Sequence, residues 1–269
     1  MEKSGPIGLI DSGNGGFTVL KELQMRLPNE NYLYFGDSIR MPYGERENDE
    51  LIRLGNAIIK KLEEQGAKAV VLACNTLSSI ISEFTSRVPL FSVIEAGVQE
   101  TISCRDLGLV GLIATTATVK NKGYEKELDL WNTQIEYIAQ GTHTLGKVIN
   151  DGQGDLQILK SNIRDAVEPI LLKGIKRGVI IEDLLLGCTH FPIVAGTIRQ
   201  MYPELNLINP ADGLVRQLEK HLQDTDYFSP GESTGVTRIL TTADYDIFET
   251  MINELELNCD TLEMTELNI

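Results

Sequence analysis

Two of the four cysteines, Cys74 and Cys188, end short apolar runs in matching sequence contexts. Residues 70–73 and 184–187 precede the two thiols, and each thiol is followed by two polar residues. A thiolate can act as a base or a nucleophile, and a position just before a helix N-terminus lowers the pKa of a thiol. We therefore expect the pair to carry chemistry. The alternative is that each cysteine packs as a small buried hydrophobic residue.

A glycine-rich turn is expected after the first predicted strand, at residues 11–16 (Asp-Ser-Gly-Asn-Gly-Gly). Glycines let a tight turn approach a ligand closely, and exposed amides together with the Ser12 hydroxyl can hold a carboxylate. A turn with only a structural role is the alternative. The turn does not match the dinucleotide-binding pattern, because Thr18 stands where the third glycine is required.

Further polar residues follow other predicted strands. His190 lies two residues after Cys188 and can act as a general acid or base, or else fill a structural role. The tyrosine of segment 42–44 (Pro-Tyr-Gly) can donate a hydrogen bond, although Pro-Tyr-Gly by itself is an ordinary turn. Three threonines within residues 115–118 offer hydroxyl groups to a ligand or cap a helix. We assign no function to the remaining histidines and cysteines, which are His143, His221, Cys104 and Cys259.

The charge composition argues against polyanionic partners. Twenty-four Lys and Arg against 39 Asp and Glu give a formal net charge of −15, which would repel nucleic-acid phosphates and anionic lipid surfaces. Apolar runs such as 69–74 and 107–114 are far shorter than the roughly 20 residues that span a bilayer. The N-terminus lacks a secretory-signal pattern, and the cysteine and histidine spacings lack those of metal sites. We therefore expect a cytoplasmic protein with reduced thiols, without a metal cofactor and without a nucleic-acid or membrane partner.

Alternating strand and helix patterns must position these residues. Short apolar runs that end in Gly, Asn, Asp or Thr alternate with stretches of helical apolar spacing, which predicts parallel sheets covered by helices. The Gly-rich segment 141–154 is expected to be a loop. The matched cysteines indicate two similar α/β halves. The expected strands are 7–11, 32–36, 69–74, 90–94, 107–114, 135–139, 184–188, 205–208 and 238–241. The expected helices are 16–26, 47–65, 76–86, 120–130, 156–173, 194–201, 213–222 and 245–255.

Four short segments together resemble the glutamate racemase family. Aspartate racemases of the same superfamily typically carry Glu where His190 stands, so this position favours glutamate. The resemblance extends over most of the chain. The four segments, in the family's order and spacing, are Asp11-Ser-Gly-x-Gly-Gly, Pro42-Tyr-Gly, Ala73-Cys-Asn-Thr and Leu186-Gly-Cys-Thr-His-Phe-Pro.

The resemblance implies a fold and a reaction. The fold would consist of two pseudo-symmetric α/β domains with mainly parallel sheets flanked by helices, and the active site would lie in the cleft between them. Residues 1–97 plus 210–269 would form the first domain and residues 98–209 the second. The reaction would interconvert L- and D-glutamate without a cofactor and supply D-glutamate for peptidoglycan, in a homodimeric cytoplasmic enzyme. Inversion at Cα needs a base and an acid on opposite faces of the substrate.

By the same resemblance, Cys74 and Cys188 would exchange the duties of base and acid. Asp11 and Asp37 would assist near Cys74. His190 would tune or orient Cys188. The amino and carboxylate groups of the substrate would be held by Asp11, Ser12, Pro42, Tyr43, Gly44, Asn75, Thr76, Thr118, Thr189 and His190.

The sequence departs from the family at several positions. A gap-free alignment places Asn150, beside Asp151, where the family carries an auxiliary Glu near the second cysteine, and Asn121 stands where Ser is common. Asn150 motivates one alternative, a non-catalytic protein that binds an amino acid in the cleft. The enzyme alternatives are a related racemase with another substrate, for example aspartate, and a cysteine-dependent lyase or hydrolase.

Overall fold

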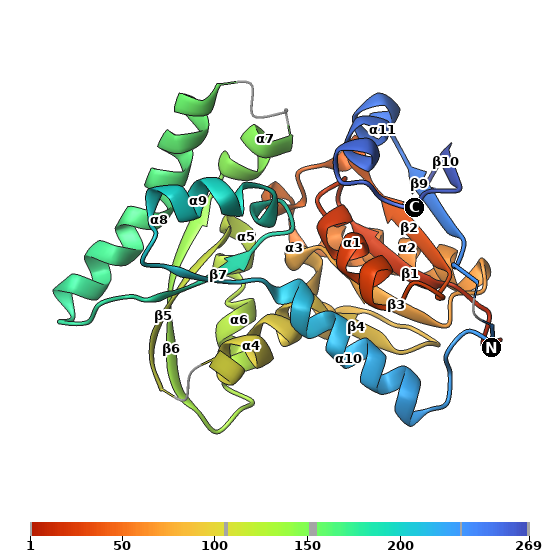
Figure 1. Cartoon of the computed structure of the whole chain (residues 1–269), viewed down its shortest axis with the longest axis horizontal. Coiled ribbons are helices and arrows are strands. Elements are labelled where there is room, and N and C mark those ends of the chain that lie inside the picture. Colours follow the sequence, from red (N-terminus) through yellow and green to blue (C-terminus); the bar gives the residue numbers. More distant parts are fainter. Residues whose placement is uncertain (1, 105–106, 151–154, 232, 268–269) are drawn as a thin grey trace.

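The computed structural model describes residues 2–104, 107–150, 155–231 and 233–267. Within these ranges the strands form two sheets, and neighbouring strands pair in parallel throughout. Figure 1 shows the two sheets side by side with helices packed on both, which confirms the predicted α/β class. The six-stranded sheet has the order β10 (Thr261–Met264), β9 (Thr237–Thr241), β2 (Tyr32–Gly36), β1 (Ile7–Asp11), β3 (Ala69–Leu72) and β4 (Leu90–Ser92). The four-stranded sheet has the order β6 (Gln134–Thr142), β5 (Leu107–Thr115), β7 (Asp183–Gly187) and β8 (Asn206–Ile208).

Most helices lie where the apolar spacing predicts them, with ends that differ by a few residues. The exceptions are α3, α4, α5, α6 and α7, which are treated below with their bounds. The helices that match the expectation are α1 (Phe17–Arg26), α2 (Asn48–Glu64), α8 (Leu156–Lys176), α9 (Ala195–Met201), α10 (Pro210–Asp224) and α11 (Tyr245–Glu254). Short 3-10 turns occur at Ser38–Arg40, Tyr43–Glu45, Ile81–Glu83 and Phe191–Val194.

Serine side chains explain two differences in the first half of the chain. The helix expected at 76–86 is only four residues long, α3 (Asn75–Ser78), because Ser78 donates its hydroxyl to the carbonyl of Leu72 at 2.8 Å and so ties this turn back to β3. The helix α4 (Val93–Cys104) begins where the strand 90–94 was expected to continue. Ser92 accepts hydrogen bonds from two backbone N–H groups in the first turn of α4 and thereby caps it.

Two further differences lie in the second half. The single helix expected at 120–130 is replaced by α5 (Thr116–Lys120) and α6 (Gly123–Leu128), which are separated at Lys122, a residue with a left-handed φ of 53°. The Gly-rich segment expected to be a loop contains the helix α7 (Leu145–Asn150), so that expectation is wrong there. Leu145 and Ile149, one helical turn apart, are both buried in the core beneath α8 and stabilise this helix. The end of the segment, residues 151–154, lies outside the described ranges.

Both sheets use the same strand order, which confirms the prediction of two similar halves. Numbered along the chain, the first four strands of each half lie in the order second, first, third, fourth, and β9 and β10 extend the first sheet beyond β2. Strand β3 is therefore equivalent to β7. In open parallel sheets, ligands bind at the carboxyl ends of the strands, at the point where the strand order reverses direction. Here that point lies between β1 and β3 in one half and between β5 and β7 in the other.

Helices cover both faces of each sheet. Helices α1, α10 and α11 share one core with the six-stranded sheet and α2 shares a second core with its other face. Helices α7, α8 and α9 cover one face of the four-stranded sheet, and α4 and α6 cover the other. All strands of each sheet come from one of the two proposed domains, although the proposed boundary at residue 97 falls inside α4. None of the described helices is long and apolar enough to cross a membrane.

Candidate active site

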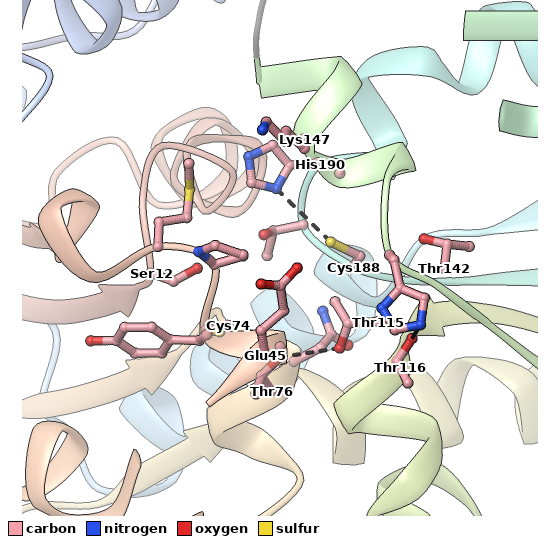
Figure 2. A pocket seen from close by; sticks show the side chains of 18 of the residues that line it. Ser12, Glu45, Cys74, Thr76, Thr115, Thr116, Thr142, Lys147, Cys188 and His190 are labelled. Carbon is pink, nitrogen blue, oxygen red and sulfur yellow. Dashed lines mark hydrogen bonds between the residues drawn. The ribbon is translucent and has the colours of Figure 1, made fainter. Parts of the chain in front are cut away.

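A cavity of about 290 Å³ is lined by residues that follow strands of both sheets. Figure 2 shows Ser12, Glu45 and Cys74 entering it from the first half, and Thr115, Thr142 and Cys188 from the second. The structure therefore brings the two matched cysteines to one cavity. Of the expected site residues, those that line it are Ser12, Pro42, Tyr43, Gly44, Cys74, Asn75, Thr76, Cys188, Thr189 and His190.

Cys74 lies at the start of α3 and is buried. The backbone N–H groups of Thr76 and Leu77 and the hydroxyl of Ser12 donate hydrogen bonds to its sulfur, and each of them lowers the thiol pKa. Burial and the negative charge of Asp11 act in the opposite direction and are stronger, so the pKa rises to about 12. The expectation that the helix N-terminus lowers the pKa is therefore wrong for the net value, although the N–H groups act as predicted.

Cys188 follows β7 and is buried in the same way. Its Sγ lies 3.9 Å from Nδ1 of His190, and the backbone N–H of His190 and the hydroxyl of Thr189 lower its pKa. Burial outweighs them and raises the pKa of Cys188 to about 12. Burial also lowers the pKa of His190 to about 4, so that the imidazole is neutral at neutral pH. In this structure both thiols are thus protonated at neutral pH.

Asp11 lies at the junction of the two halves, below the cavity lining. Its Oδ2 accepts a hydrogen bond from the hydroxyl of Thr189 at 3.1 Å, and its Oδ1 accepts one from the N–H of Gly13 at 2.9 Å. Thr18 also reaches across and donates to the carbonyl of Thr189 at 2.9 Å. Burial raises the pKa of Asp11 to about 6 in spite of these donors. When ionised, Asp11 raises the pKa of both cysteines.

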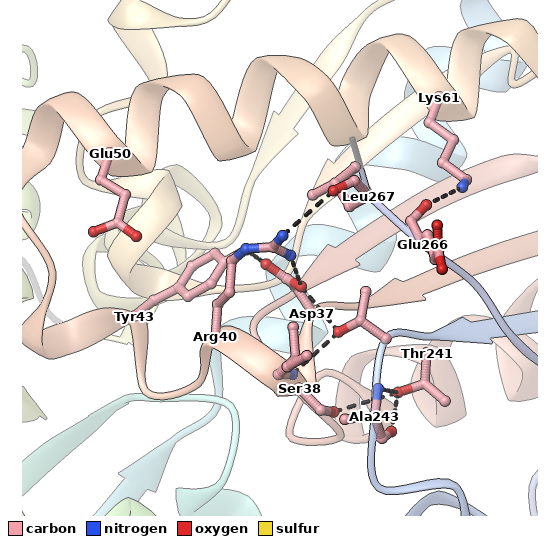
Figure 3. A network of polar contacts seen from close by, with 12 residues as sticks. Asp37, Ser38, Arg40, Tyr43, Glu50, Lys61, Thr241, Ala243, Glu266 and Leu267 are labelled. Carbon is pink, nitrogen blue, oxygen red and sulfur yellow. Dashed lines mark hydrogen bonds and ion pairs between the residues drawn. The ribbon is translucent and has the colours of Figure 1, made fainter. Parts of the chain in front are cut away.

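Asp37 is fully buried and does not belong to the described residues that line the cavity. Figure 3 shows it in a polar network: its Oδ1 accepts hydrogen bonds from Arg40 at 2.8 Å and Thr242 at 2.9 Å. Its Oδ2 accepts the hydroxyl of Tyr43 at 2.7 Å. The Tyr43 hydroxyl therefore points to Asp37, although Tyr43 is among the residues that line the cavity. The geometry places Asp37 as the anchor of the loop that carries residues 42–45.

Hydroxyl and amide groups connect the halves on the other side of the cavity. Oγ1 of Thr76 lies 3.2 Å from Oγ1 of Thr115, which lies 2.9 Å from Oγ1 of Thr118. Thr118 is fully buried and, like Asp11, lies behind the described lining residues. Oδ1 of Asn75 accepts the hydroxyl of Tyr124, from α6, at 2.6 Å. These contacts connect α3 of the first half to the end of β5 and to α6 of the second half.

The strand order points to further lining residues, of which the sequence had indicated only the threonines at 115 and 116 and, within the last motif, Phe191. Because β6 is equivalent to β2, the segment after β6 should approach the site as residues 41–45 do after β2, and residues 142–147 do so. Asn150, at the end of α7, does not line the cavity, and Asp151 lies outside the described residues. Among the described residues, no group of three or more His, Cys, Asp and Glu could hold a metal ion. The additional lining residues are Met41, Glu45, Thr115, Thr116, Thr142, His143, Gly146, Lys147 and Phe191.

Comparison with known proteins gives consistent matches. A family model described as Asp/Glu/Hydantoin racemase matches residues 21–218. Glutamate racemase 1 of Caldanaerobacter subterraneus subsp. tengcongensis is 34% identical over 249 residues, which cover 92% of this chain and 91% of that protein. The crystal structure of a glutamate racemase isoform from Bacillus anthracis has a TM-score of 0.87 at 27% identity and covers 99% of both chains. The glutamate racemase of Francisella tularensis, solved in complex with D-glutamate, has a TM-score of 0.85 at 28% identity over 99% of both chains.

These matches confirm the resemblance that the four sequence segments indicated. Racemases are isomerases, so the expectation of an enzyme of this class is also confirmed. The family model and the relatives each cover far more than half of the sequence. The chain therefore belongs to the Asp/Glu/Hydantoin racemase family.

Proposed function

We propose that this protein is a glutamate racemase in which Cys74 and Cys188 are the two bases. The observation that carries the proposal is their placement: each thiol follows the third strand of its half, and both line one cavity. Two groups that enter a cavity from opposite halves are suited to opposite faces of a small substrate. The similarity to glutamate racemases, one of them solved with D-glutamate, supports glutamate as the substrate.

The reaction moves one proton to the enzyme and one from it. The thiolate of one cysteine takes the Cα proton and becomes a thiol, and the electron pair stays on Cα. The thiol of the other cysteine donates its proton to the opposite face and becomes a thiolate. The product is the other enantiomer, and the same steps in reverse consume it. Proton transfer of this kind requires each sulfur to reach Cα directly.

Forming the thiolate is the difficult part, because burial raises the pKa of both cysteines to about 12. The ammonium group of a bound amino acid would bring a positive charge to the cavity and favour a neighbouring thiolate. The donors already aimed at Cys74, from Ser12 and the backbone of α3, need no reorganisation. Asn75, Thr76 and Thr189 supply further polar groups for the substrate, in addition to Ser12.

The biological role belongs to the same proposal. We expect racemisation without a cofactor, a homodimeric assembly, and supply of D-glutamate for peptidoglycan in the cytoplasm. The cavity volume of about 290 Å³ accommodates a five-carbon amino acid. Lys147 in its wall provides a cation for an anionic substrate.

The test is racemisation in deuterated water without added pyridoxal phosphate. L-glutamate and D-glutamate should each lose optical rotation and gain deuterium at Cα. Early in the reaction the product should carry deuterium while the remaining substrate keeps its proton, because the two protons belong to different thiols. L-aspartate in a parallel reaction distinguishes a racemase with another substrate.

Serine variants test the two cysteines. Cys74→Ser and Cys188→Ser should each nearly abolish turnover of both enantiomers. Cys104→Ser and Cys259→Ser are the matched controls, because these cysteines do not line the cavity, and they should keep full activity. Full activity in either site variant would contradict the two-base mechanism. If glutamate raised the melting temperature without Cα exchange, the protein would be a binding protein instead.

A further inference from the structure

Asn14 extends the contacts of Cys188 into the first half of the chain. Its Oδ1 lies 3.3 Å from Nε2 of His190, and Nδ1 of the same ring lies 3.9 Å from Sγ of Cys188. All three side chains are buried. Asn14, His190 and Cys188 therefore form one row of polar groups that starts in the glycine-rich turn after β1 and ends at a thiol in the cavity.

The amide nitrogen of Asn14 has no hydrogen-bond partner among the described residues, although Asn14 is only 1% exposed. An unsatisfied buried donor is destabilising and uncommon in a native protein. The oxygen and nitrogen of an amide occupy equivalent positions. A half-turn of the Asn14 amide therefore presents a donor, instead of an acceptor, to Nε2 of His190.

The proposed reaction requires Cys188 to alternate between thiol and thiolate. A thiol donates its proton to a bare Nδ1 of His190, and the proton of the neutral ring is then on Nε2. A thiolate accepts a hydrogen bond from a protonated Nδ1, and Nε2 is then bare. The group that faces Nε2 must consequently accept a hydrogen bond in one state and donate one in the other.

We propose that Asn14 is a positioning residue that supports both tautomers of His190 through the two ends of its amide. Oδ1 faces a protonated Nε2 when Cys188 is a thiol, and Nδ2 faces a bare Nε2 when Cys188 is a thiolate. This inference rests on the proposed function, because a reaction that passes through both states of Cys188 uses both arrangements. The unpartnered Nδ2 is the donor that the second arrangement needs.

The glycine-rich turn packs directly against the imidazole ring of His190. A Cβ at Gly15 would lie 2.5 Å from Cε1 and Nδ1 of His190 and 2.6 Å from Oγ1 of Thr189, so the turn is in direct contact with the ring. The ring is also neutral at neutral pH and carries a single proton. Because the ring carries a single proton, that proton lies either on Nδ1 or on Nε2. The amide of Asn14 turns to match the nitrogen that carries it.

The first experiment reads the tautomer directly and does not depend on activity. The chain has three histidines, so ¹⁵N NMR spectra of the histidine-labelled protein at pH 8 can be assigned with His143→Gln and His221→Gln. The wild type and Asn14→Asp should show the proton on Nε2 of His190, because both residues can accept it. Asn14→Leu should show a mixture of tautomers. The same tautomer population in all three proteins would overturn the proposal, whether or not the protein racemises glutamate.

The second experiment compares kcat in the two directions. Aspartate at position 14 accepts but cannot donate, so Asn14→Asp should disfavour the complex with thiolate at Cys188 and shift the ratio of the two kcat values by about fivefold, the effect of one hydrogen bond. Asn14→Leu should slow both directions and leave the ratio near that of the wild type. Asn253→Asp, an exposed asparagine on α11, is the charge control. An unchanged ratio in Asn14→Asp would mean a purely structural role.

Discussion

Asp11→Asn should stabilise the protein at neutral pH. Burial raises the pKa of Asp11 from 3.8 to about 6, so the folded state holds this proton more tightly than the unfolded state. The corresponding stability is fully present below pH 3.8 and is lost as the pH rises through 6. The pKa difference between the folded and unfolded states corresponds to about 3 kcal/mol of stability, at 1.36 kcal/mol per pH unit. An asparagine does not ionise, and its amide can still accept from Gly13 and donate to Thr189.

Urea denaturation at several pH values measures this difference. The free energy of unfolding of Asp11→Asn minus that of the wild type should increase by about 2 kcal/mol between pH 4 and pH 7.5, because part of the transition lies below pH 4. Asp165→Asn, which changes an exposed carboxylate on α8, is the control and should show no such increase. A difference that stays constant with pH would refute the assignment of a raised pKa to Asp11. The same variant should make both cavity thiols react faster with iodoacetamide, because it removes a charge that opposes their ionisation.

Two further substitutions test buried contacts, one beside the cavity and one at the amino end of β3. Gly15→Ala places a Cβ 2.5 Å from the imidazole of His190 and should lower the free energy of unfolding by about 1–3 kcal/mol. Gly196→Ala, whose Cβ would meet no atom of the described residues within 4 Å, should not lower it. Lys68→Met breaks the buried ion pair with Glu30 at 2.6 Å and should destabilise the protein by about 3 kcal/mol or more, with partial recovery when Glu30→Gln is added. Urea denaturation measures the stability of both variants. A denaturation midpoint equal to that of the wild type would contradict the prediction for that variant.

The strands and the pair of cysteines could be predicted from the sequence because both depend on local patterns. The apolar runs of β1, β3 and β7 are buried along their whole length, and such runs are readable without knowledge of their partners. The equivalence of Cys74 and Cys188 was visible in the residues around them. The structure adds the reason, which is the shared strand order of the two sheets.

The properties that depend on distant segments could not be predicted in this way. A helix N-terminus beside Cys74 predicts a low thiol pKa, but the net value is set by burial and by Asp11, which lies 63 positions earlier in the chain. The resemblance implied that Asp37 assists near Cys74; in the structure its oxygens accept hydrogen bonds from Arg40, Tyr43 and a threonine after β9. The helix α7 depends on a core that α8 completes. In each case a contact outside the local pattern decides the outcome: with Asp11 for Cys74, with Thr242 for Asp37 and with α8 for α7.

The two thiols occupy equivalent strand ends, but their partners differ. A hydroxyl and backbone N–H groups face each thiol, from Ser12 at Cys74 and from Thr189 at Cys188, but only Cys188 also faces an imidazole, that of His190. Burial and the charge of Asp11 nevertheless raise both pKa values to about 12. Racemisation has an equilibrium constant of one. An enzyme that works in both directions therefore benefits when the state with the thiolate at Cys74 and the state with the thiolate at Cys188 have similar free energies. Asp11 acts on both thiols, so its substitution should shift both pKa values together, whereas substitution of Ser12 or His190 should shift one of them and unbalance the two directions.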